Sequence, residues 1–194
     1  MLVKFLQKNN FFRGVVYKLS KARANDIFGK IKPFLNKKSH ILDIGAGTCN
    51  VCEILLEEGY NIVPLDIQDL SFVNNIKPIL YDGDKIPFDD NKFDIALILT
   101  VLHHTSYPER IIEEAKRVSR RIIIMEDIYT NIFHKYITYF LDSLLNLEFI
   151  GHPHTNKNNK LWKETFDKLG LKIVEARYSS SYLVLRHATY YLEK

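Results

Sequence analysis

Two acidic residues and two glycines have the spacing of a nucleoside-binding turn. Asp43 lies two residues before Gly45 and four before Gly47, and the next apolar run, residues 61–65, ends at Asp66. Glycine lets the backbone turn tightly and approach a ligand. A carboxylate at the end of a strand can accept hydrogen bonds from both ribose hydroxyls. The sequence therefore predicts that a nucleoside-containing ligand binds here.

Two classes of cofactor use such a turn, and a third glycine distinguishes them. A dinucleotide site requires Gly-x-Gly-x-x-Gly, but Asn50 stands where the third glycine would be. The carboxylate of Asp43 would repel a diphosphate, whereas it would attract a ligand that carries an amino group or a sulfonium. The turn therefore favours S-adenosylmethionine over NAD.

Several residues near the ends of later apolar runs are candidates for acid–base chemistry. They are His103, His104, Glu126, His152 and His154. Histidine exchanges a proton near neutral pH, so one of them could deprotonate an acceptor. Each of the first two histidines could instead be structural, and the last two could belong to a shaped lid. Three histidines and an acid could also bind a metal, but no spacing brings them together, so we predict no metal.

Apolar runs alternate with segments of helical spacing between residues 41 and 126. Strands are predicted at residues 41–45, 61–66, 77–81, 93–100 and 121–126, and helices at 48–58, 69–75 and 108–119. A further helix at about 160–169 precedes strands at 172–178 and 182–192. Such alternation is typical of a mostly parallel sheet. Ligands bind at the carboxyl ends of its strands, so the candidate residues are expected at one edge.

These motifs together resemble the class I S-adenosylmethionine-dependent methyltransferases, in particular the small-molecule group that includes the ubiquinone and menaquinone pathway enzymes. The resemblance runs from about Ile41 to Ser119. It rests on the motifs at residues 41–47, 65–66, 81–88, 93–95, 101–104 and 114–118. Sequence at 125–127, 146–149 and 151–154 resembles uncharacterised bacterial methyltransferases without identifying a substrate.

The resemblance implies an α/β fold, a Rossmann-like three-layer sandwich with a mostly parallel seven-stranded sheet and an antiparallel edge strand. It also implies the cofactor contacts. These are Asp43 near the amino group of the methionine part, Gly45, Ala46 and Gly47 along that part, Asp66 at the ribose, Ile67 on the adenine, Asp82 and Gly83 beside the adenine amino group, and Leu99 and Thr100 on the sulfonium side. Cys49 departs from the family, because many relatives have a third glycine there.

A Cys-x-x-Cys pair, Cys49 and Cys52, opens the first predicted helix of the core. A helix amino end lowers the pKa of a thiol, which would suit redox chemistry. The pair lies inside the cofactor turn, however, and the chain has no second pair to complete a zinc site. We therefore predict neither a redox nor a metal role for it.

Positive charge is concentrated in residues 1–40, which carry a net charge of +9, whereas the remaining residues carry −5. Apolar residues in this segment have helical spacing. We predict a basic amphipathic helical cap at 1–38 and a methyltransferase domain at 39–194. The alternative is an arm that contacts a membrane surface, through residues 1–20, or a nucleic acid. With neither a long apolar run nor a leader pattern, the sequence predicts a cytoplasmic protein.

A second apolar helical pattern follows the fifth predicted strand, at residues 132–145. We predict that residues 129–155 form a helical insertion and loop that shapes the acceptor pocket. The alternative is an ordinary core helix.

The sequence predicts a methyltransferase that passes a methyl group by direct displacement to a small-molecule acceptor and leaves S-adenosyl-L-homocysteine. The run at residues 100–104 differs from the Asn-Pro-Pro-aromatic motif used on base amines, so no nucleic acid is favoured. Two alternatives remain, a non-catalytic cofactor-binding partner protein and an RNA methyltransferase that uses the basic amino-terminal arm. The sequence predicts no oligomeric state.

Overall fold

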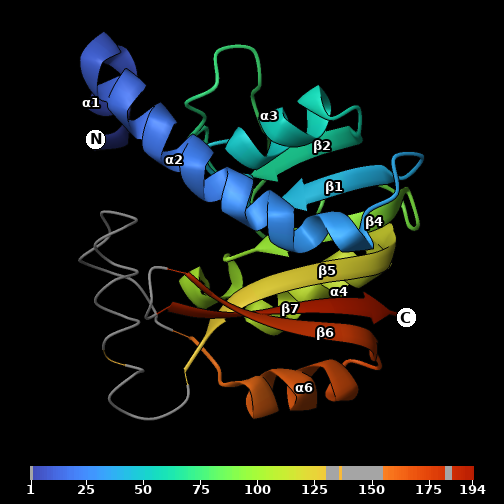
Figure 1. Cartoon of the computed structure of the whole chain (residues 1–194). Helices are drawn as coiled ribbons and strands as arrows, with labels where there is room; N and C mark the ends of the chain where they lie inside the picture. Colours follow the sequence, from blue (N-terminus) through green and yellow to red (C-terminus); the bar gives the residue numbers. More distant parts are fainter. Residues whose placement is uncertain (1, 130–135, 137–154, 182–184) are drawn as a thin grey trace.

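A seven-stranded sheet forms the centre of the computed structural model, which describes residues 2–129, 136, 155–181 and 185–194 (Figure 1). The strand order is β3-β2-β1-β4-β5-β7-β6. The strands are β1 (His40–Ile44), β2 (Asn61–Asp66), β3 (Ile79–Leu80), β4 (Phe93–Leu99), β5 (Ser119–Ile128), β6 (Lys172–Ser181) and β7 (Leu185–Glu193). The first five pair in parallel, and β7 is antiparallel to both β5 and β6. The predicted Rossmann-like fold, with antiparallel pairing at one edge, is confirmed, and β7 lies one position inside the edge.

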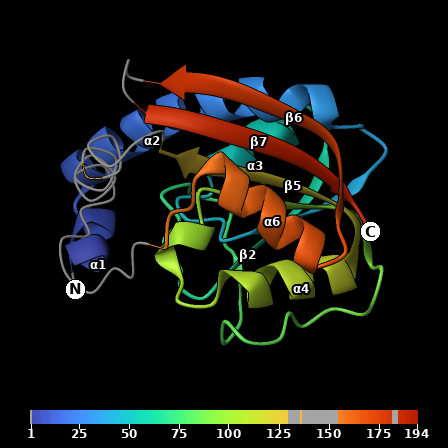
Figure 2. The ribbon, with the colours of Figure 1, turned by 90° about the horizontal axis from the view of Figure 1, so that it is seen from below.

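Helices cover both faces of the sheet and make a three-layer structure (Figure 2). One face packs against α2 (Asn10–Ile31) and α3 (Asn50–Glu57), and the other against α4 (Pro108–Val118) and α6 (Asn159–Lys168). Side chains of β4 alternate between these layers, because Ile95 and Leu97 face α2 and α3 while Ala96 and Ile98 face the opposite layer. The central strands are thus buried on both sides, as their continuous apolar runs predict.

The segment after β2 differs from the sequence-based expectation. We predict a short helix at residues 69–75, and that prediction is wrong, because the chain runs there without helical structure. Polar side chains bind the local backbone instead. The Asp69 carboxylate accepts from Ser71 N at 3.2 Å, and the Ser71 hydroxyl lies 2.6 Å from Ile76 O. Such local bonds compete with helix formation.

The amino-terminal segment forms α1 (Leu2–Lys8), α2 and a 3-10 turn, η1 (Lys32–Phe34). The second half of α2 is part of the core, since it buries Ala24, Ile27, Phe28 and Ile31. The arrowheads of β1 and β2 point toward the side of the molecule where α1 lies (Figure 1). α1 therefore stands near the carboxyl edge of the sheet, where ligands are expected.

Most of the predicted insertion, residues 130–135 and 137–154, lies outside the described residues, and so do the candidates His152 and His154. Among the helices that the structure does describe, none has the length and apolar character needed to cross a membrane.

Candidate functional site

The turn after β1 is held against the end of β2. The backbone N–H groups of Gly45 and Ala46 donate to Leu65 O at 2.8 and 3.1 Å. Gly45 has a φ of +77°, and a Cβ there would lie 2.5 Å from Val101 Cγ2. Only glycine fits this position without a shift of its neighbour. The turn is therefore packed directly against the loop that follows β4.

Asp66 lies at the carboxyl end of β2 and faces the same turn. Its two carboxylate oxygens accept hydrogen bonds from Gly47 N at 2.8 Å and Gln68 N at 3.1 Å. A carboxylate oxygen has more than one acceptor direction, so each still has capacity for a further donor. Asp66 thus fixes the turn and remains able to accept from a ligand hydroxyl.

Asp43 is almost fully buried beneath the turn, where Cys52 Sγ donates to Oδ2 at 3.1 Å. Burial raises the pKa of Asp43 to about 6, and the negative charge of Asp66 adds to the rise, while the Cys52 hydrogen bond opposes it. Two carboxylates therefore share a poorly solvated region. A cationic group near the turn would stabilise the ionised form of Asp43.

The expected adenine-side residues lie together at the carboxyl ends of β2 and β3. The side chain of Ile67 is 55% exposed. A Cβ at Gly83 would lie 3.3 Å from Ile67 Cγ2, so these two residues are neighbours. The Asp82 carboxylate accepts from the backbone N–H groups of Asp84 and Lys85 and fixes the turn. The arrangement leaves an apolar surface beside a narrow glycine turn.

Thr100 directly follows β4 and has a left-handed conformation, with a φ of +57°. Its N–H donates to Met125 O at 2.7 Å, and its hydroxyl lies 3.3 Å from Arg23 Nη2 on α2. Leu99 is buried in the layer beneath α2 and α3. The amino-terminal helix thus reaches the edge where the sulfonium side of the cofactor is expected.

Glu126 and His103 form a buried pair that holds the loop after β4. Glu126 Oε1 accepts from Val101 N at 2.9 Å and Leu102 N at 2.8 Å, while Oε2 lies 2.6 Å from His103 Nδ1. Both side chains have no exposed surface. The geometry suits positioning of η2 (Leu102–His104) rather than contact with an acceptor.

His104 is less buried than His103, and the centroids of the two rings are 4.1 Å apart. Thr155, just after the undescribed segment, donates through its N–H to His103 O at 3.3 Å. The chain therefore returns to the loop after β4 immediately beyond His154. Of the bases that the sequence predicts within the described residues, His103 is fully buried and His104 is only partly buried.

Two polar residues that the sequence analysis left out of the site form a second buried pair. His187 Nδ1 on β7 lies 2.6 Å from Asp127 Oδ1 on β5, and both side chains are buried. Burial alone would raise the pKa of Asp127. The hydrogen bond and charge of His187, with the charges of His103 and Arg23, outweigh burial and lower that pKa. The two residues are far apart in the sequence and meet because β5 and β7 pair in antiparallel register, so no local sequence pattern could have predicted the pair.

The two cysteines are both free and buried. Burial raises the pKa of Cys49 to about 12, and burial with the charge of Asp43 also raises that of Cys52. A thiol is nucleophilic and binds metals as the thiolate, so these values argue against redox chemistry. Over the described part of the chain, no three potential metal ligands cluster.

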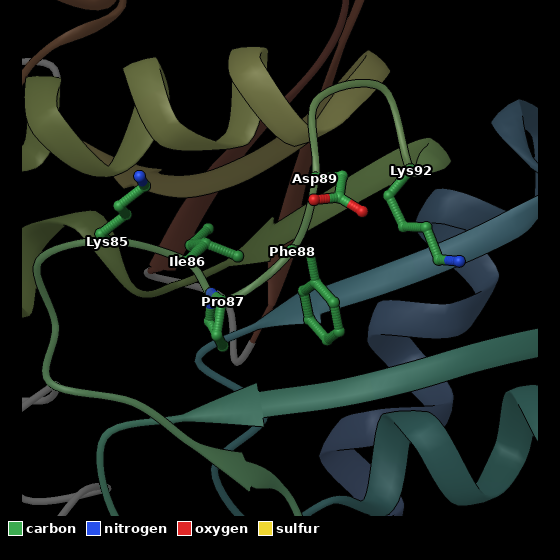
Figure 3. Close-up of a pocket in the computed structure, with 6 residues that line it drawn as sticks. All are labelled: Lys85, Ile86, Pro87, Phe88, Asp89 and Lys92. Carbon is green, nitrogen blue, oxygen red and sulfur yellow. The ribbon is translucent and has the colours of Figure 1, made fainter.

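An open hollow of about 690 Å³ lies along the return from β3 to β4 (Figure 3). Its lining residues are Lys85, Ile86, Pro87, Phe88, Asp89 and Lys92. None of them is a candidate site residue, and the chain between β3 and β4 forms no helix. The hollow thus lies along the connection from β3 to β4 rather than at the cofactor turn.

Comparison with known proteins agrees with this geometry. Residues 42–122 match the model of a family described as a methyltransferase domain. A curated relative, an uncharacterized protein of Methanocaldococcus jannaschii, is 36% identical over 85 residues, which make up 43% of this chain and 41% of that protein. The matched region therefore spans about two fifths of the relative's length.

Solved structures resemble nearly the whole chain. A SAM-dependent methyltransferase from Aquifex aeolicus has a TM-score of 0.66 at 17% identity, over 94% of this chain and 98% of that one. A chain from the complex of the Haloferax volcanii Trm112 methyltransferase activator with a methyltransferase has a TM-score of 0.66 at 15% identity, over 91% and 95%. Identities this low establish the fold alone. Residues 42–122 are thus similar to a methyltransferase domain, and the fold is that of the solved SAM-dependent methyltransferase from Aquifex aeolicus.

Proposed function

We propose that this protein is an S-adenosylmethionine-dependent methyltransferase that acts on a small-molecule acceptor. One observation carries the proposal: Asp66, at the end of β2, accepts from Gly47 N and keeps capacity for ribose hydroxyls. That carboxylate lies within the segment that matches a methyltransferase family. The structural neighbour from Aquifex aeolicus, described as SAM-dependent, supports the same cofactor.

The described residues fit the three parts of this cofactor. Asp66 would bind the ribose, and the exposed side chain of Ile67 beside Gly83 would contact the adenine. The methionine part would lie along Gly47, where a Cβ would meet nothing nearer than a backbone oxygen at 4.0 Å. Its positive charge would be attracted by Asp43, whose ionised form is poorly solvated in the free protein.

Methyl transfer requires little covalent help from the protein. The bound cofactor supplies an electrophilic methyl group, and the acceptor atom displaces the sulfur as it bonds to that carbon. The protein must align the acceptor and exclude water. An acceptor hydroxyl or ammonium group must also lose a proton, to a side chain or to solvent.

We infer two candidate bases at the acceptor side. His104 lies on η2, which the buried Glu126 and His103 hold in place. His187 lies beside Asp127, whose Oδ1 is 2.6 Å from its Nδ1 and would orient the ring. We therefore propose Glu126 and His103 as positioning residues. His152 and His154 remain candidates outside the described residues.

The small-molecule class remains part of the proposal, together with a cytoplasmic location. Two alternatives have specific support. The Haloferax volcanii neighbour was solved with an activator protein, which supports the alternative of a partner-dependent or non-catalytic role. The basic amino-terminal segment supports the alternative of an RNA acceptor, and RNA binding would then weaken steeply with salt.

Tritiated S-adenosylmethionine tests the proposal directly. The purified protein is incubated with panels of small phenols, quinones and amines, with cellular RNA, and with a cell extract. We expect label in a small organic product, and a large loss of label with His104→Ala or His187→Ala, whichever residue is the base. Cofactor binding should persist in that variant. Labelling of RNA alone, or binding without transfer to any acceptor, would contradict the proposal.

A further inference from the structure

The amino-terminal helices carry an exposed row of large apolar side chains, which we name the amino-terminal stripe. Its members are Phe5, Phe11, Phe12, Val15 and Leu19, with exposed fractions of 56%, 73%, 41%, 42% and 68%. The ring of Phe12 lies 5.9 Å from that of Phe5 and 5.5 Å from that of Phe11. Phe11, Val15 and Leu19 follow at four-residue steps and so share one face of α2. The stripe is therefore continuous along two helices.

The stripe is surrounded by positive charge. Residues 2–25 contain six Lys or Arg and no acid. Lys4, Lys8 and Lys18 are exposed. Neither these three nor Arg13 forms an ion pair with any residue that the structure describes. The surface thus offers exposed apolar groups and exposed cations together.

The opposite face of the same helices is firmly attached to the domain. Lys21 forms ion pairs with Glu53 and Glu57 at 2.9 Å each, and Tyr17 donates to Glu53 at 3.1 Å. The Gln7 amide donates to the carbonyl oxygens of Asp69 and Ser71. Lys21, which faces the domain, is thus neutralised by acids of α3. The stripe is held outward on an anchored helix.

We propose that the amino-terminal stripe docks this protein onto the surface of an anionic lipid bilayer. Aromatic and aliphatic side chains beside lysines are the composition with which amphipathic helices bind the membrane interface. Each basic residue adds attraction to anionic headgroups. Docking of this kind requires no membrane-spanning helix, and none of the described helices is long and apolar enough to be one.

Two other occupants fit these observations less well. A second copy of the chain would bring two clusters of like charge together without acids to balance them, which opposes association. RNA would be attracted by the lysines and could stack on Phe11, but Val15 and Leu19 offer no ring on which a base could stack. Aliphatic and aromatic side chains in one row favour lipid.

Vesicle flotation with the full chain tests the proposal and needs no methyl acceptor. Vesicles of phosphatidylcholine alone are compared with vesicles that contain phosphatidylglycerol. We expect binding to the anionic vesicles and at least roughly tenfold weaker binding by the double variant Phe11→Ser/Leu19→Ser. The variant Lys4→Glu/Lys8→Glu/Lys18→Glu should lose the preference for anionic lipid.

The control Leu161→Ser/Val174→Ser removes two apolar side chains, 41% and 48% exposed, from α6 and β6. It should bind vesicles like the wild type. Circular dichroism of each variant verifies that the fold is retained. Equal binding by the stripe variant and the control would overturn the proposal. So would binding to RNA without binding to vesicles, or a concentration-dependent dimer that only the stripe variant disrupts.

Discussion

The cofactor side and the acceptor side of the sheet edge use buried acids in different ways. At the ends of β1 and β2, Asp66 accepts hydrogen bonds from Gly47 N in the turn after β1 and from Gln68 N just after β2. At the end of β5, Glu126 and Asp127 face histidines that lie 23 and 60 positions away in the sequence. The first arrangement leaves acceptor capacity for a ligand. The second places each acid against a buried histidine, so the acids shape the site through other groups.

Glu126→Ala should have the largest effect on stability. It removes a buried carboxylate that accepts from Val101 N, Leu102 N and His103. Unpaired buried groups of this kind cost about 3 to 5 kcal/mol of unfolding free energy. Urea denaturation would measure the loss. Glu126→Gln keeps one carbonyl acceptor and should lose less, whereas equal stability of Glu126→Ala and the wild type would contradict the positioning role.

Gly45→Ala tests how tightly the two sides are packed together. The new Cβ would lie 2.5 Å from Val101 Cγ2, in a left-handed conformation, so we expect a loss of about 2 to 4 kcal/mol. Gly47→Ala is the matched control, because its φ is +50° but no atom lies closer than 4.0 Å. It should cost only about 1 to 2 kcal/mol. Val101→Ala should restore part of the stability of Gly45→Ala, and no rescue would refute the contact.

Asp66→Ala should act on cofactor binding. Loss of charge-assisted hydrogen bonds would weaken binding of S-adenosylhomocysteine by about 1.5 to 3 kcal/mol. Asp82→Ala is a useful comparison, because that carboxylate accepts from Asp84 and Lys85 in an exposed turn. We expect a smaller loss there. Calorimetric titration of both variants would decide, and identical affinities for Asp66→Ala and the wild type would remove Asp66 from the site.

Asp43→Asn should stabilise the free protein while weakening its binding of the cofactor. The folded-state pKa of Asp43 is about 6 against 3.8, so the folded protein binds this proton more tightly than the unfolded chain does. Ionised Asp43 therefore lowers stability above pH 6, and this penalty fades as the pH falls toward 4. At pH 7.5 we expect a gain of about 1 to 3 kcal/mol for the variant. Thermal unfolding at pH 7.5 and at pH 4 would measure this gain in stability. A gain that does not depend on pH would contradict the raised pKa of Asp43.

The same contrast explains what the sequence could predict. The turn after β1 and the acid that ends β2 are defined by local spacing, and the structure has β1 and β2 within one residue of the predicted strands. The helix predicted at 69–75 is wrong, because Asp69 and Ser71 bind nearby backbone groups. Asp127 and His187 meet through the antiparallel register of β5 and β7, which the spacing of nearby residues in the sequence cannot predict. The small-molecule acceptor, the quinone-type resemblance and the domain bounds stay predictions.

We expect the turn between β1 and α3 to bind the nucleoside of S-adenosylmethionine. Calorimetric titration of the wild-type protein with S-adenosylhomocysteine, and in parallel with NAD, tests it most directly. We predict saturable, one-to-one binding of S-adenosylhomocysteine and no binding of NAD, because Asp43 and Asp66 place two acids at the turn and position 50 is Asn. Saturable binding of NAD, with no binding of S-adenosylhomocysteine, would contradict this prediction.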